Sequence, residues 1–362
     1  MSKKIYLDHA ATSPISDNVK KQIINEIDHW HNPNSIYEDG QINKYKIKLA
    51  KTVIASFIGA EPDEIIFTSG GSEANALAID GFLRANLEFD RCIGSSIEHS
   101  SILNNPNCYP QITCDKSGFI NMSSLPNYPA FCAVMMVNNE IGTIQPIKKI
   151  AQKIHSCGGI LLCDGVQALG KQYIDVKDLD VDMMSFSGHK IGALKGIGFL
   201  YVRKGIQLAP IIHGTQENNL RGGTYNTLGI ISLRAAIQEW NFFNNNKIRW
   251  LRDKLIEGLT QIDGVILNGS YSFRCVSNIN VRINTSLTGQ QIVTLLDNMG
   301  FQISAGSACH EGDAAPSHVL KAIGLSDDEA NRSIRITLGA ENTEKDIEAF
   351  LDTLSEIIAL SE

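Results

Sequence analysis

The chain has 362 residues, and its 32 Lys and Arg against 39 Asp and Glu give a formal net charge of −7. Its length is more than twice the roughly 150 residues of an average domain, so we expect two domains. The acidic balance excludes a basic nucleic-acid-binding surface, and the 20% share of charged residues excludes a disordered chain. The N-terminus has no apolar signal segment, and no run of about 18 apolar residues occurs, so we expect a cytoplasmic protein without a membrane partner.

Short apolar runs rich in β-branched residues recur through the first two hundred positions. These runs are expected strands at 64–68, 133–137, 159–163, 183–186 and 198–202. Strands without polar alternation are buried on both faces, which predicts a parallel sheet covered by helices in an α/β architecture. Helices are expected between them, at 72–83 and at 147–157.

The pattern changes in the last third of the chain. A long helical stretch from 228 to 259, interrupted near the asparagines at 244–246, is expected to lead into a second domain. Strands at 277–283 and 332–338 then mix with helices at 290–299 and 343–360. This mixture predicts a smaller α+β domain.

An anion site is indicated by Thr68-Ser-Gly-Gly-Ser72, which follows an expected strand and begins a helix. Free backbone N–H groups and a serine hydroxyl meet there, as phosphate requires. Taken alone, the same residues also fit an ordinary turn and helix cap.

A carboxylate and a lysine end two consecutive expected strands. Asp164 follows the strand at 159–163, and Lys190 follows Ser185-Phe-Ser-Gly-His189. Pyridoxal phosphate (PLP) needs this pair, because its pyridinium nitrogen binds a carboxylate and its aldehyde binds a lysine. Taken singly, Asp164 also fits a helix N-cap and Lys190 a surface lysine in a glycine-rich loop. The segment 165–171 matches G-x-x-x-x-G-K, but Gln172 replaces the Ser or Thr that would bind Mg²⁺, so we reject a P-loop.

The eight cysteines are at least six positions apart, which does not fit C-x₂₋₄-C metal sites, so we expect no metal and mostly reduced, buried thiols. Cys309 differs, because it lies among small and polar residues and precedes His310. An exposed thiol of this kind can act as a nucleophilic thiolate, and the alternative is a spare surface cysteine.

Together these motifs resemble the NifS/IscS-like cysteine desulfurases, fold-type I PLP enzymes of the class-V aminotransferase family. The resemblance runs from Tyr6-Leu-Asp-His-Ala-Ala-Thr-Ser-Pro14 to Ser333-Ile-Arg-Ile-Thr-Leu-Gly339. It implies a large domain at 15–250 with a mixed, mostly parallel seven-stranded sheet. It also implies a smaller α+β domain, formed by 1–14 and 251–362, that carries the Cys309 loop. The segment 213–224 departs from the family pattern, since it is one residue shorter and lacks an arginine.

The resemblance also implies roles for individual residues. Lys190 would form the Schiff base, His99 would stack on the ring and move protons, and Cys309 would accept sulfur. The remaining residues would bind cofactor or substrate: Asp164 at the pyridine nitrogen, Gln167 at the ring hydroxyl, Gly71, Ser72, Ser187 and His189 at the phosphate, Thr224 at the phosphate of a neighbouring subunit, Asn139 in the active site and Arg335 at the substrate carboxylate.

The implied activity converts L-cysteine to L-alanine and leaves a persulfide on Cys309. The expected partners are L-cysteine, a second copy of the chain in a homodimer, and a sulfur-acceptor protein. The acceptor pathway stays open among iron–sulfur cluster assembly, tRNA or DNA thiolation and thiocofactor synthesis. A selenocysteine lyase or another PLP-dependent C–S lyase is the alternative enzyme, and a binding subunit of a sulfur-relay complex is the non-enzymatic alternative.

Overall fold

The computed structural model describes residues 4–240, 242–305 and 315–361, with the side chains of 242–244 left out. Its largest sheet has seven strands in the order β2-β8-β7-β6-β5-β3-β4. The strand β8 runs antiparallel to both neighbours, and the other pairs are parallel, which confirms the mixed, mostly parallel sheet. The strands are β2 (Ile65–Thr68), β3 (Cys92–Ser95), β4 (Cys108–Ile112), β5 (Phe131–Ala133), β6 (Ile160–Asp164), β7 (Met183–Ser187) and β8 (Gly198–Val202).

Helices cover both faces of this sheet. Side chains of α3 (Gly71–Ala85) share one hydrophobic cluster with Ile66 and Leu162, while α2 (Glu38–Ile58), α5 (Ile147–His155) and α7 (Thr227–Glu239) share another with Phe67 and Phe186. Neighbouring strand residues therefore pack against opposite helical layers, which explains the continuous apolar runs in the sequence.

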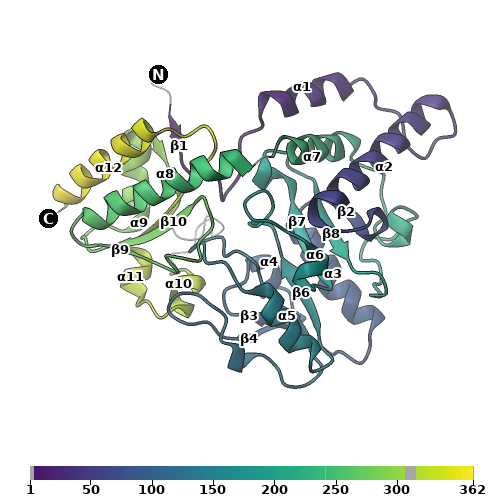
Figure 1. The fold of residues 1–362 in the computed structure, drawn as a ribbon, viewed down its shortest axis with the longest axis horizontal. Coiled ribbons are helices and arrows are strands. Elements are labelled where there is room, and N and C mark those ends of the chain that lie inside the picture. Colours follow the sequence, from purple (N-terminus) through teal and green to yellow (C-terminus); the bar gives the residue numbers. More distant parts are fainter. Residues whose placement is uncertain (1–3, 241, 306–314, 362) are drawn as a thin grey trace.

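A third hydrophobic cluster gathers around smaller sheets in the C-terminal part of the chain. The strands β9 (Val265–Leu267), β10 (Asn278–Ile283) and β12 (Ser333–Thr337) form an antiparallel sheet, and β1 (Ile5–Tyr6) pairs in parallel with β11 (Phe301–Gln302). The helices α8 (Phe242–Gln261), α9 (Gly289–Asn298) and α12 (Glu344–Ala359) pack with them, and Figure 1 shows α8 and α12 side by side. The domain boundaries at 15–250 and 251–362 stay a prediction.

The remaining helices are short or lie at the periphery. They are α1 (Asp17–Glu26), α4 (Ser100–Leu103), α6 (Val176–Leu179), α10 (His318–Ala322) and α11 (Asp327–Asn331), with 3₁₀ turns at Pro62–Glu64, Met122–Ser124, Gly188–Ile191 and Glu217–Asn219. Within the described residues, no helix is both long enough and apolar enough to cross a membrane.

Two sequence-based boundaries were wrong. The long helical stretch breaks at Trp240, which ends α7 in an extended conformation, and the asparagines at 244–246 lie inside α8. The Trp240 indole donates a hydrogen bond to the Gly170 carbonyl, so a tertiary contact accompanies the break. The strand predicted at 133–137 ends at Ala133, although Val134 and Met136 still donate backbone hydrogen bonds to Leu162 and Asp164.

Candidate active site

A cavity of about 310 Å³ lies at the carboxyl-terminal edge of the seven-stranded sheet. This is where open α/β sheets place ligands, and the volume falls in the range of small-molecule sites. Every predicted site residue except Thr224 and Cys309 lines this cavity. The lining residues from the sequence prediction are Gly71, Ser72, His99, Asn139, Asp164, Gln167, Ser187, His189, Lys190 and Arg335.

The first turn of α3 supplies the anion-binding end of the cavity. Gly71 begins this helix, and a Cβ there would lie 2.7 Å from Cγ2 of Val166. A Cβ at Gly198 on β8 would lie 2.6 Å from the Cα of Gly70, so the helix start approaches the sheet closely. Because α3 is 15 residues long and has no side-chain cap, its first N–H groups are available to an anion.

His189 borders the same end of the cavity as an uncharged ring. Burial, followed by the neighbouring Lys190 and Lys195 ammonium groups, lowers the pKa of His189 to about 4. Its Nδ1 lies 3.1 Å from the Thr12 hydroxyl. At neutral pH the uncharged His189 ring can therefore bind a phosphate through a hydrogen bond. It adds no positive charge to this end of the cavity.

A hydrogen-bonded chain links Asp164 to His99. Asp164 accepts from the Val166 N–H at 2.9 Å and from Asn75 Nδ2 at 3.1 Å, and Asn75 Nδ2 also donates to Ser101 Oγ at 3.0 Å. His99 Nδ1 lies 2.9 Å from Ser101 Oγ and accepts from the Ser101 N–H at 3.1 Å. Since Nδ1 is the acceptor, the neutral ring carries its proton on Nε2.

Asn75 is a site residue that the sequence prediction missed. It lies four residues after Gly71 on α3, and both line the cavity. Positions four apart share a helix face, so the helix start at Gly71 was the available signal.

Lys190 lies beneath the N-terminal segment of the chain. Its Nζ donates to the Ala10 carbonyl at 2.6 Å and to the Ala11 carbonyl at 2.7 Å. The Ala10 N–H in turn donates to Thr337 Oγ1 at 2.9 Å. These contacts come from backbone carbonyls, and the sequence prediction assigned no role to Ala10 or Ala11.

Arg335 lies in β12 with 2% of its surface exposed. Its Nη2 donates to Asp8 Oδ1 at 2.9 Å and its Nη1 to the Asn139 carbonyl at 3.2 Å. No described residue accepts a hydrogen bond from Nε. A buried donor without an acceptor is costly, and a ligand carboxylate in the adjoining cavity would satisfy it.

Comparisons with known proteins show which family the chain belongs to. The family described as "Aminotransferase class-V" matches residues 5–350. The "Cysteine desulfurase IscS" of Methanosarcina thermophila is 37% identical, over 99% of this chain and 92% of that protein. The chain belongs to the class-V aminotransferase family, as a NifS/IscS-like cysteine desulfurase.

Solved structures agree with this assignment. The NifS-like protein from Rickettsia africae has a TM-score of 0.88 and 30% identity, with 98% of this chain and 99% of that chain covered. The structure titled "SspA in complex with cysteine" has a TM-score of 0.82 and 34% identity, with 94% of this chain and all of that chain covered.

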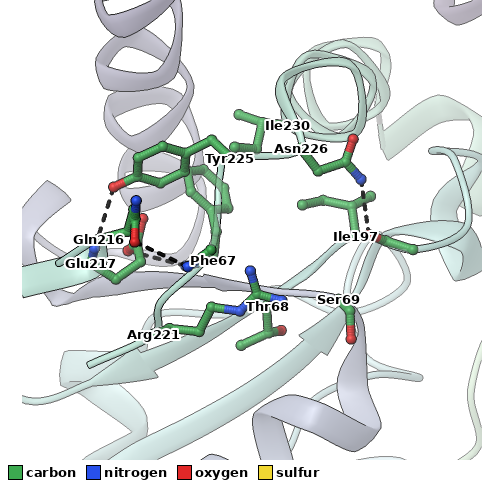
Figure 2. A pocket seen from close by; sticks show the side chains of 12 residues that line it. Phe67, Thr68, Ser69, Ile197, Gln216, Glu217, Arg221, Tyr225, Asn226 and Ile230 are labelled. Carbon is green, nitrogen blue, oxygen red and sulfur yellow. Dashed lines mark hydrogen bonds between the residues drawn. The ribbon is translucent and has the colours of Figure 1, made fainter. Parts of the chain in front are cut away.

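Thr224 does not reach the cavity of its own chain. It is exposed, on a loop next to a second, much smaller cavity of about 30 Å³. Figure 2 shows Arg221, Glu217 and Tyr225 around that small cavity, close to the Thr68–Ser69 segment. Arg221 donates to the Glu73 carboxylate through Nε at 2.7 Å and Nη2 at 3.1 Å. The guanidinium thereby balances the negative charge of Glu73, which lies in the first turn of α3.

The loop before Thr224 takes an unusual backbone conformation, within the segment that departs from the family pattern. Glu217, Asn218 and Asn219 have φ values of 48°, 56° and 65°, where residues other than glycine are strained. The buried Glu217 carboxylate accepts from Lys51 Nζ at 2.6 Å and from the Phe67 N–H at 3.2 Å, as the dashed lines in Figure 2 show for Phe67. These contacts hold the strained turn in place.

Cys309 lies outside the described residues. The other seven cysteines are free thiols, five of them buried. Burial raises the pKa of Cys132 to about 12 and raises the pKa of Cys92 and Cys163 as well, so these thiols resist ionisation.

Proposed function

We propose that this cysteine desulfurase removes sulfur from L-cysteine in the 310 Å³ cavity and transfers it to Cys309. The observation that carries the proposal is the meeting of Asp164, Lys190 and Arg335 in one cavity. An acid for a pyridinium, an amine for an aldehyde and a guanidinium for an amino-acid carboxylate are together the groups that PLP chemistry on an amino acid requires.

The residues of the cavity fit PLP. The uncapped start of α3 and the neutral His189 suit the phosphate, and Asp164 suits the ring nitrogen. When bound, PLP would withdraw electrons from the Cα of the substrate. Lys190 would hold the cofactor aldehyde, and Gln167 would donate a hydrogen bond to the ring hydroxyl.

The substrate is bound and deprotonated by residues of this chain. The unpaired Arg335 Nε would hold the carboxylate, and Asn139, whose carbonyl already fixes the guanidinium, would border it. Lys190 would move the proton at Cα. His99, with its proton on Nε2, would act as the second proton carrier.

Cys309 would receive the sulfur as a thiolate. Its Sγ forms a bond to the substrate sulfur, the bond from that sulfur to the substrate carbon breaks, and the carbon skeleton takes up protons to leave as alanine. Described residues on both sides of 306–314, the segment that contains Cys309, support this role. Ser304 exchanges backbone hydrogen bonds with Arg335, at 3.1 and 2.7 Å, and His318 Nε2 lies 2.9 Å from the carbonyl of Glu98, next to His99.

A second copy of the chain is the partner that the exposed residues favour. Exposed apolar side chains occur near the end of α1, in the segment that links it to α2, and on α2, at Ile24, Ile27, Trp30, Ile36, Tyr37 and Tyr45. Trp30 is 78% exposed and Ile36 95% exposed, which is costly for a monomer. The exposed Thr224 would then bind the cofactor phosphate in the neighbouring subunit. Light scattering should give a dimer mass, and Trp30→Ser with Ile36→Ser should lower that mass toward one chain.

The test of the activity is mass spectrometry after brief exposure to L-cysteine without reductant, with a PLP absorbance spectrum recorded first. Bound PLP, alanine and one added sulfur on the Cys309 peptide support the proposal. Cys309→Ala should keep the cofactor and lose the sulfur transfer. Alanine formed with no sulfur retained on Cys309 would favour a lyase, and a protein that binds no PLP would contradict both.

A further inference from the structure

Lys171 lies behind the cavity wall, in the segment whose P-loop-like spacing the sequence presented. Its Nζ donates to Oε1 of Gln167 at 2.8 Å. Gln167 lines the cavity, whereas Lys171 is absent from the lining. The lysine therefore binds a side chain of the site, and any effect it has on a ligand must pass through Gln167.

Two contacts fix the Gln167 carboxamide in one orientation. The Lys171 ammonium can only donate a hydrogen bond, so it must face the amide oxygen. The Ala10 carbonyl can only accept, and it receives a hydrogen bond from Gln167 Nε2 at 3.0 Å. Both partners require the same orientation of the Gln167 carboxamide. The second hydrogen on Nε2 remains available to a ligand in the cavity that Gln167 borders.

The orientation does not depend on the charge of Lys171. Burial, followed by the nearby Arg335 guanidinium, lowers the pKa of Lys171. A neutral amine keeps N–H donors beside its lone pair, and the Ala10 carbonyl still takes a hydrogen from Nε2, so the same orientation of Gln167 satisfies both partners in either protonation state. Without Lys171, Oε1 would lose that donor, and an unsatisfied buried oxygen would favour rotation of the amide toward other donors.

We propose that Lys171 is a positioning residue that holds Gln167 with its Nε2 hydrogen pointing at the oxygen substituent of the cofactor ring. The inference rests on the proposed function, because it takes PLP as the ligand. Gln167 would then lower the basicity of that oxygen, since a donated hydrogen bond stabilises its anionic form. Lys171 would act on the ring without touching it.

The test is a double-mutant cycle on the full-length protein with Lys171→Met, Gln167→Met and both together. The measured quantities are the PLP dissociation constant and the pH at which the absorbance of bound PLP titrates. Each single variant should raise the dissociation constant about fivefold, the effect of one hydrogen bond, and move the titration to higher pH. The double variant should be no worse than Gln167→Met, because both changes remove the same hydrogen bond to the ring.

Lys46→Met is the matched control. Because Lys46 pairs with Glu26 inside the proposed dimer surface, its variant needs a second control: Lys254→Met removes a partly buried lysine that pairs with Glu344 on α12, outside that surface and outside the cavity lining, so both measured quantities should stay unchanged in Lys254→Met. Lys171→Arg keeps a donor and should retain most of the affinity, which gives a second variant if Lys171→Met does not fold.

Three results would overturn the inference. Bound PLP in Lys171→Met could titrate at the same pH as in the unchanged protein, or the losses of PLP affinity could add in the double variant. The third is a loss of PLP affinity in Lys171→Arg as large as that in Gln167→Met. Failure of the proposed function would look different, because the unchanged protein would then bind no PLP.

Discussion

Asn75→Leu tests the hydrogen-bonded chain between Asp164 and His99. The asparagine is 1% exposed, and its Nδ2 donates to the Asp164 carboxylate and to Ser101 Oγ. Losing a hydrogen bond to a charged acceptor costs about 1.5–3 kcal/mol, and losing one to a neutral acceptor costs about 1 kcal/mol. No described donor reaches Asn75 Oδ1, so removing that oxygen offsets about 1 kcal/mol. The free energy of unfolding should fall by about 2 kcal/mol.

A closely matched control lies on α2. Asn43 is also 1% exposed, its Nδ2 donates to the His29 and His31 carbonyls at 2.8 Å each, and no described donor reaches its Oδ1. Asn43→Leu should cost about 1 kcal/mol, because both lost acceptors are neutral.

Urea unfolding of the cofactor-free proteins measures the two stabilities, and titration with PLP measures the affinities. Asn75→Leu should weaken PLP binding about tenfold, because Asp164 loses the donor that orients its Oδ2, while Asn43→Leu should leave affinity unchanged. Equal affinities in the two variants would refute the role of Asn75 in the site.

Three further changes test other parts of the site. Because His189 has a folded pKa of about 4 against 6.5 unfolded, its neutral form stabilises the fold above pH 6.5, and about 1–2 kcal/mol should be lost as the pH falls toward 4. Urea unfolding at several pH values should show a flatter curve for His189→Asn, and an equally steep one would contradict the assignment. Gly198→Ala should cost about 1–3 kcal/mol and weaken PLP binding, whereas Gly70→Ala, whose Cβ would meet nothing closer than 3.9 Å, should keep its stability. Asn218→Ala should lower the free energy of unfolding by about 1 kcal/mol and Asn218→Gly should not, because only glycine relieves the positive φ; a similar loss in both would show that side-chain contacts matter instead.

The parts of the fold predicted best were continuously apolar strands that end in polar residues. The strands β6 and β7 end at Asp164 and Ser187, close to their predicted limits, because burial on both faces leaves a continuous apolar run. The strands β3 and β4 were missed. Gly94 and Pro110 interrupt the β-propensity of their sequences.

The site residues that the sequence missed act through groups without a sequence signature. Ala10 and Ala11 contribute backbone carbonyls, which any residue could supply. Asn75 is a polar residue inside a helix and becomes informative only when Asp164 is known to lie 3.1 Å away. Lys171 was weighed only as part of a P-loop, because spacing along the chain does not show that its Nζ meets Gln167.

The proposed substrate end of the cavity, at Arg335, and the proposed cofactor end, at Lys190, belong to different sheets, and Ala10 joins them. Its N–H donates to Thr337, two residues beyond Arg335 on β12, and its carbonyl accepts from Lys190 after β7. The separation of the guanidinium from the lysine amine is therefore fixed through one short stretch of backbone. An α-amino acid carries its carboxylate and its reacting Cα a fixed distance apart, so this link favours such a substrate over ligands with other spacings. With the proposed roles of Arg335 and Lys190, the N-terminal segment takes part in selecting the substrate, although it contributes no reactive side chain there.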